Sequence, residues 1–438
     1  MGLPPEQVIR ANFKRNFIAN VADVAFWSVG AACASTASVL PLYLLHLTTN
    51  PVLIGMIPSL QFLGWRLPQV FTANLTDQMR RKLPFILWIS LNERLPYLFL
   101  GLFMLVWRGQ SRQVTLAIVF ALLCWQAVGG GLIATPWQEY IAKIILPHRW
   151  GLFFGTGNAI GALVGVGGAA LSAYLLSHFV FPRGFAYSYL IAFVFSMLSF
   201  AALTFTVEPP VEPSKPRIPF RTYLQRLPQV VRADRNFRNY LWVRSFATFC
   251  TMGSGFMAVH AVEKFHMGDS AAGLFTAVML ISTAALNPLL GHYGDRISHK
   301  LILTVSFWMQ AAAMAIAAIA PNPAIFIAAL ALRAGADAAA MSSGMTIVFE
   351  FCSPQDRPTY IGLANTLTAP PVVIAPLIGG VVASAVGYPA VFWISAILGL
   401  ASVVAWQRFV IDPRLYSQAQ SAQATSDSSA LADLAGDS

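Results

Sequence analysis

The segments ANLTDQMRRK (residues 73–82) and GHYGDRISHK (residues 291–300) carry the same pattern of acidic and basic residues. Asp77 and Asp295 are 218 positions apart, and arginine and lysine residues follow each of them. Other features recur at nearly the same offset, because Arg15-Asn16-Phe17 corresponds to Arg235-Asn236-Phe237, 220 positions later. The chain therefore contains two halves that repeat one another.

The composition predicts a membrane protein. Of the 438 residues, 57% are hydrophobic and 11% are charged, whereas a soluble domain carries about 25% charged residues. A water-soluble fold has no means of hiding so much apolar surface, so we expect a lipid bilayer to surround the chain. The net charge of +10 does not indicate nucleic-acid binding, because the basic residues are placed as topology signals.

Twelve apolar segments are long enough to cross a bilayer, which takes about 20 mostly apolar residues. We predict an all-α membrane protein with twelve transmembrane helices in two pseudo-symmetric six-helix bundles. The first six segments are 17–46, 51–72, 84–107, 113–141, 151–178 and 184–207. The second six are 239–262, 270–290, 301–320, 323–350, 358–385 and 388–411.

The residues between these segments predict the domain boundaries. Residues 1–207 form the predicted N-terminal bundle, and residues 239–414 form the C-terminal bundle. The cytoplasmic linker, 208–238, is first rich in proline and then basic and amphipathic, which predicts a helix lying on the membrane surface. The tail, 415–438, is rich in Ser, Ala, Gln and Asp, a composition typical of a disordered segment.

The distribution of Lys and Arg predicts the orientation, because cytoplasmic loops carry an excess of both. With the N-terminus in the cytoplasm, the outer loops hold few of the 28 Lys and Arg residues, namely Arg108, Arg112, Arg183 and Lys264. We therefore expect a multi-pass protein of a bacterial inner (plasma) membrane with both termini in the cytoplasm. The first helix is too long for the apolar core of a cleaved signal peptide, so we expect it to direct insertion.

The two repeated segments resemble the loop signature of the major facilitator superfamily, which reads roughly GxLaDrxGrKxxl. The second copy keeps Gly291, Asp295, Arg296 and Lys300. The first copy keeps Leu75, Asp77, Arg81 and Lys82, and departs from the signature at Ala73 and Arg80. The resemblance extends to about Arg414. It implies two bundles around a central cavity that opens alternately to the two sides of the membrane.

The resemblance also implies a gate on the cytoplasmic side. Carboxylates are stabilised at helix N-termini, so we expect Asp77 to contact the start of the eleventh helix and Asp295 the start of the fifth. Glu139 and Glu350 end the fourth and tenth helices, where they could pair with Arg81 and Arg296 respectively. These contacts would close the cytoplasmic side and break when it opens. The alternative is that the charges only set the topology.

Four ionisable residues lie inside the first three predicted helices: Asp23, Arg66, Glu93 and Arg94. They lie roughly 9–15 Å from the cytoplasmic helix ends at about 1.5 Å per residue. Such residues are costly in a bilayer and usually face a cavity or one another. Asp23, and then Glu93, are the predicted sites of proton coupling, with the arginines as partners that control ionisation. The alternative is a permanent charge cluster that holds the helices together.

The predicted substrate cavity includes a charged pair in the second half. Arg333 and Asp337 lie one turn apart on the tenth helix, near the middle of the membrane. They contact either the substrate or only their neighbours in the packed bundle. The other candidate cavity residues are Phe26, Trp27, Trp125, Gln126 and Asn365. Aromatic walls with few polar groups would suit an amphipathic organic solute.

The predicted function is secondary active transport of a small organic solute by alternating access, in the form of proton-coupled efflux. APLIGG, residues 375–380, looks like the core of an antiporter motif, although that motif belongs on the fifth helix. A second hypothesis is an importer or uniporter of a small metabolite. A third is a carrier-like receptor or assembly factor that transports nothing.

Other classes of function find little support in the sequence. No GxxxxGK[ST] loop occurs, which argues against direct ATP drive, and no nucleophile–base pair indicates an enzyme. The four cysteines (Cys33, Cys124, Cys250 and Cys352) lack a CxxC spacing, so no metal or cofactor is predicted. The expected partners are the lipid bilayer, a small-molecule substrate and protons. We expect a monomer that binds no nucleic acid.

Overall fold

The computed structural model describes residues 5–69, 72, 79–106, 111–146, 149–210, 231–232, 234–344, 346–352 and 357–414, and these contain helices but no strand. The first half consists of α1 (Pro5–Cys33), α2 (Val39–Leu45), α3 (Pro51–Arg66), α5 (Leu83–Leu105), α6 (Arg112–Ile144), α7 (Trp150–His178) and α8 (Arg183–Thr204). Most of the predicted linker helix and the whole predicted tail lie outside the described residues.

The second half follows the same plan. It consists of α10 (Arg235–Thr248), the 3-10 turns η2 (Phe249–Thr251) and η3 (Ser254–Phe256), α11 (Met257–Phe265), α12 (Ala271–Arg296), α13 (His299–Ile319), α14 (Pro323–Gly344), α15 (Thr346–Glu350), α16 (Arg357–Val386) and α17 (Tyr388–Phe409).

Within the described ranges, nine helical stretches are long and apolar enough to cross a membrane. They are α1, α6, α7, α8, α12, α13, α14 with α15, α16 and α17. The protein is therefore an integral, multi-pass membrane protein. The three other predicted segments are also helical: α3 is short, α5 carries charges in its middle, and α10–α11 is interrupted. The count of twelve crossings stays a prediction.

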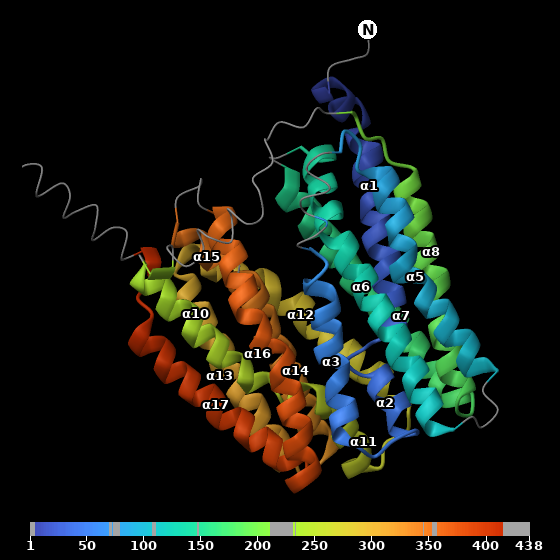
Figure 1. Ribbon diagram of the computed structural model, residues 1–438, viewed down its shortest axis with the longest axis vertical. Helices are drawn as coiled ribbons and strands as arrows, with labels where there is room; N and C mark the ends of the chain where they lie inside the picture. The colour runs from blue at the N-terminus through green and yellow to red at the C-terminus, as the bar shows by residue number, and fades with distance from the viewer. Residues whose placement is uncertain are drawn as a thin grey trace, which may run out of the picture.

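The helices form two bundles (Figure 1). In the first bundle α1 packs along α7 and α8, and α5 packs along α6 and α8. In the second, α14 packs along α12 and α13, and α13 packs along α17. Across the bundles, α3 runs beside α16 and α7 beside α12. We call the side where α1 begins and α17 ends the terminal side, and the opposite side the far side. Figure 1 shows the bundles close together on the far side and apart on the terminal side.

Small residues allow the bundles to meet on the far side. A Cβ atom added to Gly273 of α12 would lie 2.3 Å from the carbonyl oxygen of Ala169 on α7. A Cβ atom on Gly380 of α16 would lie 2.7 Å from Cα of Val52 on α3. Glycine is the residue that permits such backbone approach. The far side is therefore closed by direct packing of helix backbones.

The first long helix of each half is interrupted near the far side. In the first half the helix stops at Cys33 and resumes at Val39 as α2; the serine and threonine residues between them compete with the backbone for hydrogen bonds. Ser38 in this break lies 2.5 Å from the hydroxyl of Thr276 on α12. In the second half, Thr248 and Met257 flank a stretch of two 3-10 turns. Each break therefore bends the chain at the contact between the bundles.

On the terminal side, an asparagine ties the first helix of each half to the segment that follows the last helix. Asn16 donates to the carbonyl oxygen of Val207 at 2.9 Å and accepts from its N–H at 2.8 Å. Asn236 makes the same two bonds with Ile411, both at 2.9 Å. The repeat in the sequence is thus also a repeat of contacts between an asparagine on the first helix of each half and the backbone just after the last helix.

We predict that Asn236→Ala lowers the free energy of unfolding by about 2 kcal/mol, because it leaves the N–H and C=O of Ile411 without their partner. Thermal unfolding in detergent measures the effect. Asn239→Ala is the matched control, since Asn239 makes one bond, to the carbonyl oxygen of Phe409 at 2.9 Å. Equal losses of stability in the two variants would contradict this account of Asn236.

Candidate functional site

Asp23 on α1 and Arg94 on α5 are joined through a single hydroxyl group. Ser199 on α8 donates to Oδ1 of Asp23 at 2.6 Å and accepts from Nη2 of Arg94 at 3.1 Å. Trp137 on α6 donates to the other carboxylate oxygen of Asp23 at 3.3 Å. Asp23 is 5% exposed and Arg94 is 2% exposed. The two opposite charges therefore compensate each other in the interior of the first bundle.

The guanidinium of Arg94 is held on several sides. Its Nε donates to the carbonyl oxygen of Ser196 at 2.9 Å, and its Nη1 donates to that of Ser90 at 3.1 Å. The guanidinium carbon lies 5.4 Å from the centre of the Trp27 ring, in a cation–π contact. A planar guanidinium suits such a set of fixed acceptors. Arg94 is therefore a rigid partner for the carboxylate of Asp23.

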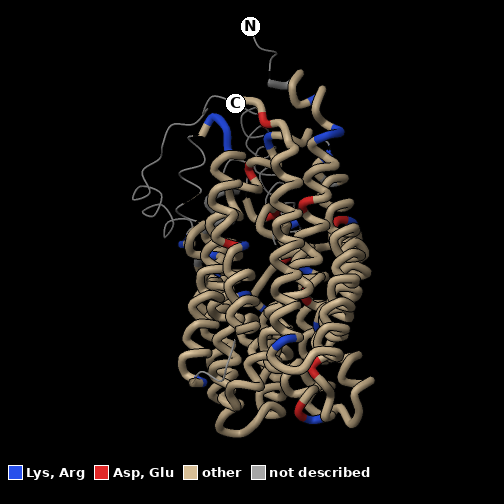
Figure 2. The backbone as a smooth tube through the Cα atoms, turned by 90° about the vertical axis from the view of Figure 1, so that its right-hand side faces the viewer, with Lys and Arg blue, Asp and Glu red and all other residues tan. Residues whose placement is uncertain are grey.

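The other two charges predicted for this group take no part in the link through Ser199. Glu93 is directed toward α6, where a Cβ on Gly130 would lie 2.7 Å from its Oε1 atom. Arg66 reaches across to the second bundle, where its Nη1 donates to Oδ1 of Asn365 on α16 at 2.7 Å. The structure therefore brings Asp23 and Arg94 together and separates Arg66 from them. Figure 2 shows charged residues near both ends of the molecule and also part-way along the helices.

Arg333 and Asp337 form an ion pair on α14, with Nη2 and Oδ2 2.9 Å apart. The Arg333 side chain is 13% exposed and reaches Met279 on α12, whose sulfur lies 3.7 Å from Nη2. The Asp337 side chain is 43% exposed. A carboxylate that is exposed part-way along a spanning helix needs water or a polar ligand beside it, because lipid offers no hydrogen bond.

The predicted aromatic cavity residues make contacts within the first bundle. Phe26 lies 6.3 Å from Phe195 between ring centres, and Trp27 lies 6.2 Å from Tyr97. Trp125 donates from Nε1 to Asn92 at 3.2 Å. Gln126 is buried and donates to the hydroxyl of Tyr97 at 3.3 Å. All four residues thus have partners inside the first bundle, and their contact with a substrate stays a prediction.

The predicted gate residues have partners that the sequence analysis did not assign. Glu139 pairs with Lys82 rather than with Arg81. Glu350 pairs with Arg414 at 2.6 Å, and Nε2 of His299 lies 3.8 Å from it. The predicted pairs Arg81–Glu139 and Arg296–Glu350 are not formed in this arrangement of the described chain, in which the bundles are apart on the terminal side, and they stay predictions for a closed terminal side. Asp77 lies outside the described residues. Gly291, Asp295, Arg296 and Lys300 all lie at the α12–α13 connection, and the side chain of Asp295 is 75% exposed.

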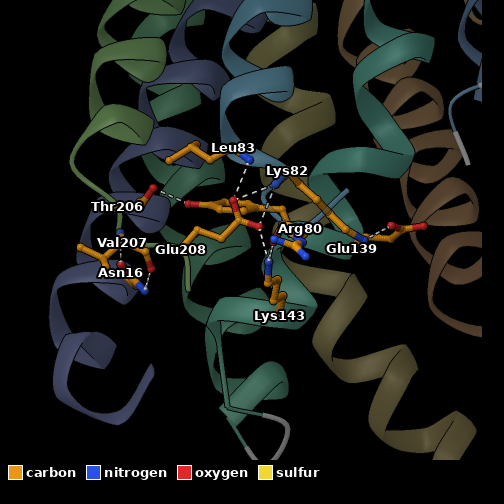
Figure 3. Close-up of polar contacts among 10 residues, drawn as sticks. Asn16, Arg80, Lys82, Leu83, Glu139, Lys143, Thr206, Val207 and Glu208 are labelled. Atoms are coloured by element: carbon orange, nitrogen blue, oxygen red, sulfur yellow. Dashed lines mark hydrogen bonds and ion pairs between the residues drawn. The ribbon is translucent and has the colours of Figure 1, made fainter. Parts of the chain in front are cut away.

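Glu208 is a residue of this region that the sequence analysis missed (Figure 3). Its Oε2 accepts from the backbone N–H groups of Lys82 and Leu83, both at 2.8 Å, and its Oε1 pairs with Lys143 at 2.7 Å. Its side chain is 2% exposed. The carboxylate therefore caps the N-terminus of α5, where free N–H groups and the helix dipole favour an anion.

The second half repeats this arrangement with a shorter acid. Asp412 accepts a hydrogen bond from Ser298, the N-cap residue of α13, and Arg414 donates to the carbonyl oxygen of Asp295 at 3.0 Å. Glu208 and Asp412 each follow the last helix of their half. These equivalent positions could have indicated a shared role for Glu208 and Asp412. The sequence analysis did not use them, because it assigned Glu208 to the linker.

On the far side, a hydrogen-bonded contact between a histidine and an aspartate joins the two bundles. His46 at the end of α2 lies 2.8 Å from Oδ2 and 3.0 Å from Oδ1 of Asp269, just before α12. The His46 ring stacks on Phe181 with centres 4.3 Å apart. Together with the glycine contacts, this pair holds the far side closed.

The comparisons with known proteins agree with this geometry. The model of the Major Facilitator Superfamily matches residues 247–435. A variant of the nucleoside transporter NupG has the same fold with a TM-score of 0.72 at 13% identity, over 90% of this chain and 100% of that chain. The chain therefore has the fold of major facilitator superfamily transporters, and its second half matches the model of that family. A second solved structure with the fold of this superfamily is the D-xylose-proton symporter, with a TM-score of 0.67 at 12% identity, over 92% of this chain and 98% of that one.

Curated relatives in the superfamily match over shorter stretches. The efflux pump apf11 of Gibberella fujikuroi is 33% identical over 138 residues, which are 31% of this chain and 24% of that protein. The riboflavin transporter RibZ of Clostridioides difficile is 24% identical over 146 residues, or 33% of this chain and 32% of that protein. The matches thus span about a quarter to a third of these relatives' length.

We predict that Ser199→Ala destabilises the first bundle by about 1–3 kcal/mol, since it removes the hydroxyl that Asp23 and Arg94 share. Thermal unfolding in detergent measures the loss. The control is Ser177→Ala, which removes an exposed hydroxyl near the end of α7. If both variants unfold at the wild-type temperature, Ser199 is not a necessary link between the two charges.

Proposed function

We propose that this protein is a secondary active transporter that moves a small organic solute by alternating access, driven by protons and in the direction of efflux. The terminal side is the cytoplasmic side of a plasma membrane in this proposal, in keeping with the distribution of Lys and Arg. Relatives that match part of the chain include a protein named as an efflux pump, which supports this direction. The single chain carries both bundles, so the proposed working unit is a monomer.

The exposed carboxylate of Asp337 is the observation that carries the proposal. It is 43% exposed on a helix that is apolar enough to cross the membrane. Arg333, its partner, contacts α12, which packs against α7 of the other bundle. A charged pair at this place fits a water-filled path between the bundles, with the far side closed and the terminal side open.

Asp23 is the residue we propose for proton coupling. Its carboxylate is almost fully buried and shares Ser199 with Arg94, so gain or loss of a proton changes the charge balance of that cluster. A carboxylate that exchanges protons with one side at a time would link proton movement to the movement of the bundles. Glu93, which lies near the same cluster on α5, is the second candidate.

We predict that Asp337→Cys reacts with a membrane-impermeant thiol reagent that reaches the terminal side. The experiment uses a chain in which Cys124 and Cys352, both partly exposed, are replaced by serine. The control is Ile397→Cys on α17, a position that is 62% exposed in the isolated protein and that we expect to face lipid. If neither cysteine reacts with the reagent, the result would contradict the water-filled path.

We predict that Asp23→Asn abolishes solute accumulation driven by a pH gradient in proteoliposomes while solute exchange continues. Loss of the titratable group uncouples the proton, but the bundles can still move. Glu263→Gln, at an exposed position on α11, should leave accumulation unchanged. Full accumulation in Asp23→Asn would exclude Asp23 from coupling. If no solute moves in the wild-type protein under any gradient, a receptor or assembly factor becomes the better account.

A further inference from the structure

Arg66 is a charged side chain inside the helices whose main partner is neutral. It is half-buried, and the one hydrogen bond that it makes within the described chain goes to the amide oxygen of Asn365, at 2.7 Å. Its guanidinium carbon lies 5.8 Å from the centre of the neighbouring Trp65 ring. Among the described residues, no carboxylate lies within 4.0 Å of it. Its positive charge is therefore not neutralised by the part of the protein that the structure describes.

Arg244 on α10 is a second half-buried arginine that packs on an aromatic ring and has no carboxylate beside it. Its guanidinium carbon lies 5.8 Å from the centre of the Tyr240 ring. The group packs over Gly344 of α14, where an added Cβ would lie 2.6 Å from Nη2. It is half-buried, and the described chain again offers no carboxylate within 4.0 Å.

The two arginines belong to opposite bundles and meet at one junction. Arg66 lies at the end of α3 and Arg244 lies on α10, and both helices pack against α16. Ser245, next to Arg244, donates to the carbonyl oxygen of Leu367 on α16 at 3.4 Å, and Asn365 lies two residues before Leu367. The junction is therefore formed by α3, α10 and α16, with two positive charges facing it.

Arg94 and Arg333, which also lie inside the helices, do have acidic partners. Asp23 compensates Arg94 through Ser199, and Asp337 compensates Arg333 directly. A buried charge without a counter-charge is destabilising, whereas an oxyanion that accepts from guanidinium groups forms short, strong hydrogen bonds. An anion that enters between the bundles would supply the missing charge.

The surroundings of Arg66 indicate what the rest of such an anion is like. A hollow between α3 and α16 is lined by Arg66 and Asn365 together with Phe62, Leu63, Thr368 and Val372. These neighbours are mainly apolar, so they suit the hydrocarbon part of a ligand whose charged end is at the arginines. A free inorganic anion has no apolar part that could contact these neighbours.

We propose that Arg66 and Arg244 form a binding site for the carboxylate of an amphipathic organic anion, which is the solute class that the protein carries. The proposal rests on the transport function proposed above for its physiological meaning. The site itself is a binding site and is tested by binding. Its two halves come from the two bundles, so an anion bound there joins them on the open side.

Binding to the full-length protein in nanodiscs of neutral phosphatidylcholine tests the site. Benzoate and 1-naphthoate are the probes, benzamide and 1-naphthamide are their neutral counterparts, and thermal unfolding at constant ionic strength is the readout. We expect the carboxylates, but not the amides, to raise the unfolding temperature. Arg66→Gln and Arg244→Gln should each weaken binding about tenfold or more, because each removes charge-assisted hydrogen bonds. Arg112→Gln, at an exposed position at the start of α6, should bind as the wild type does.

Asn365→Asp separates anion binding from a purely structural role. It places a carboxylate beside Arg66, where the amide oxygen now lies 2.7 Å from Nη1. We expect the unliganded variant to unfold at or above the wild-type temperature while its affinity for benzoate falls about tenfold or more, since the internal carboxylate competes with the ligand. A lower unfolding temperature with unchanged affinity would assign Asn365 to packing alone and contradict the proposed site.

Two further outcomes overturn the proposal. One is that the carboxylates do not stabilise the wild type, or that they stabilise the two arginine variants as much as the wild type. The other is stabilisation by nanodiscs that contain phosphatidylglycerol but not by the soluble carboxylates, which would make the site one for a lipid headgroup. Carboxylate binding without movement of benzoate into proteoliposomes would remove the transport function and leave the anion site in place. Transport of neutral solutes without carboxylate binding would remove the anion site and leave the transport function in place.

Discussion

The arrangement of this protein depends on one constraint: a charged side chain within the spanning helices has to find a partner inside the protein, because lipid offers none. The described helices meet this constraint in different ways. Asp23 and Arg94 share the hydroxyl of Ser199, and Arg333 has Asp337 one turn away on the same helix. Arg66 extends to the other bundle and finds the amide of Asn365. Where compensation is complete the charges hold a bundle together, and where it is incomplete we propose a place for a ligand.

The repeat in the sequence provides two bundles that are held together by matching contacts. Asn16 and Asn236 tie the first helix of each half to the segment after the last one. Glu208 and Asp412 connect that segment to the start of the third helix of each half. Contacts between the bundles are different in kind, because they include glycine packing and the His46–Asp269 pair on the far side. Strong contacts within the bundles and separable contacts between them are what alternating access requires.

Much of the fold was predictable from the sequence because apolar length and repeated motifs are linear signals. The helices, the two-bundle plan and the family follow from them. The partners of individual side chains were harder to predict, since they depend on helix rotation and on contacts between distant segments. Glu139 pairs with Lys82 rather than the adjacent Arg81, and adjacent residues on a helix point about 100° apart. Glu208 follows an apolar run and precedes prolines, so the sequence alone placed it in a linker, although it caps α5.

The claim that the two bundles rock about a central site is tested most directly by distances between spin labels. One pair, at Leu152 on α7 and Ile297 after α12, reports on the terminal side, and the other, at Tyr174 and Leu274, reports on the far side. The distances are measured by double electron–electron resonance in nanodiscs at several pH values. The account predicts two populations of the protein. In one the terminal-side distance is long and the far-side distance short, and in the other this order is reversed. A single population that is unchanged at every pH, with and without the carboxylate probes, would contradict alternating access.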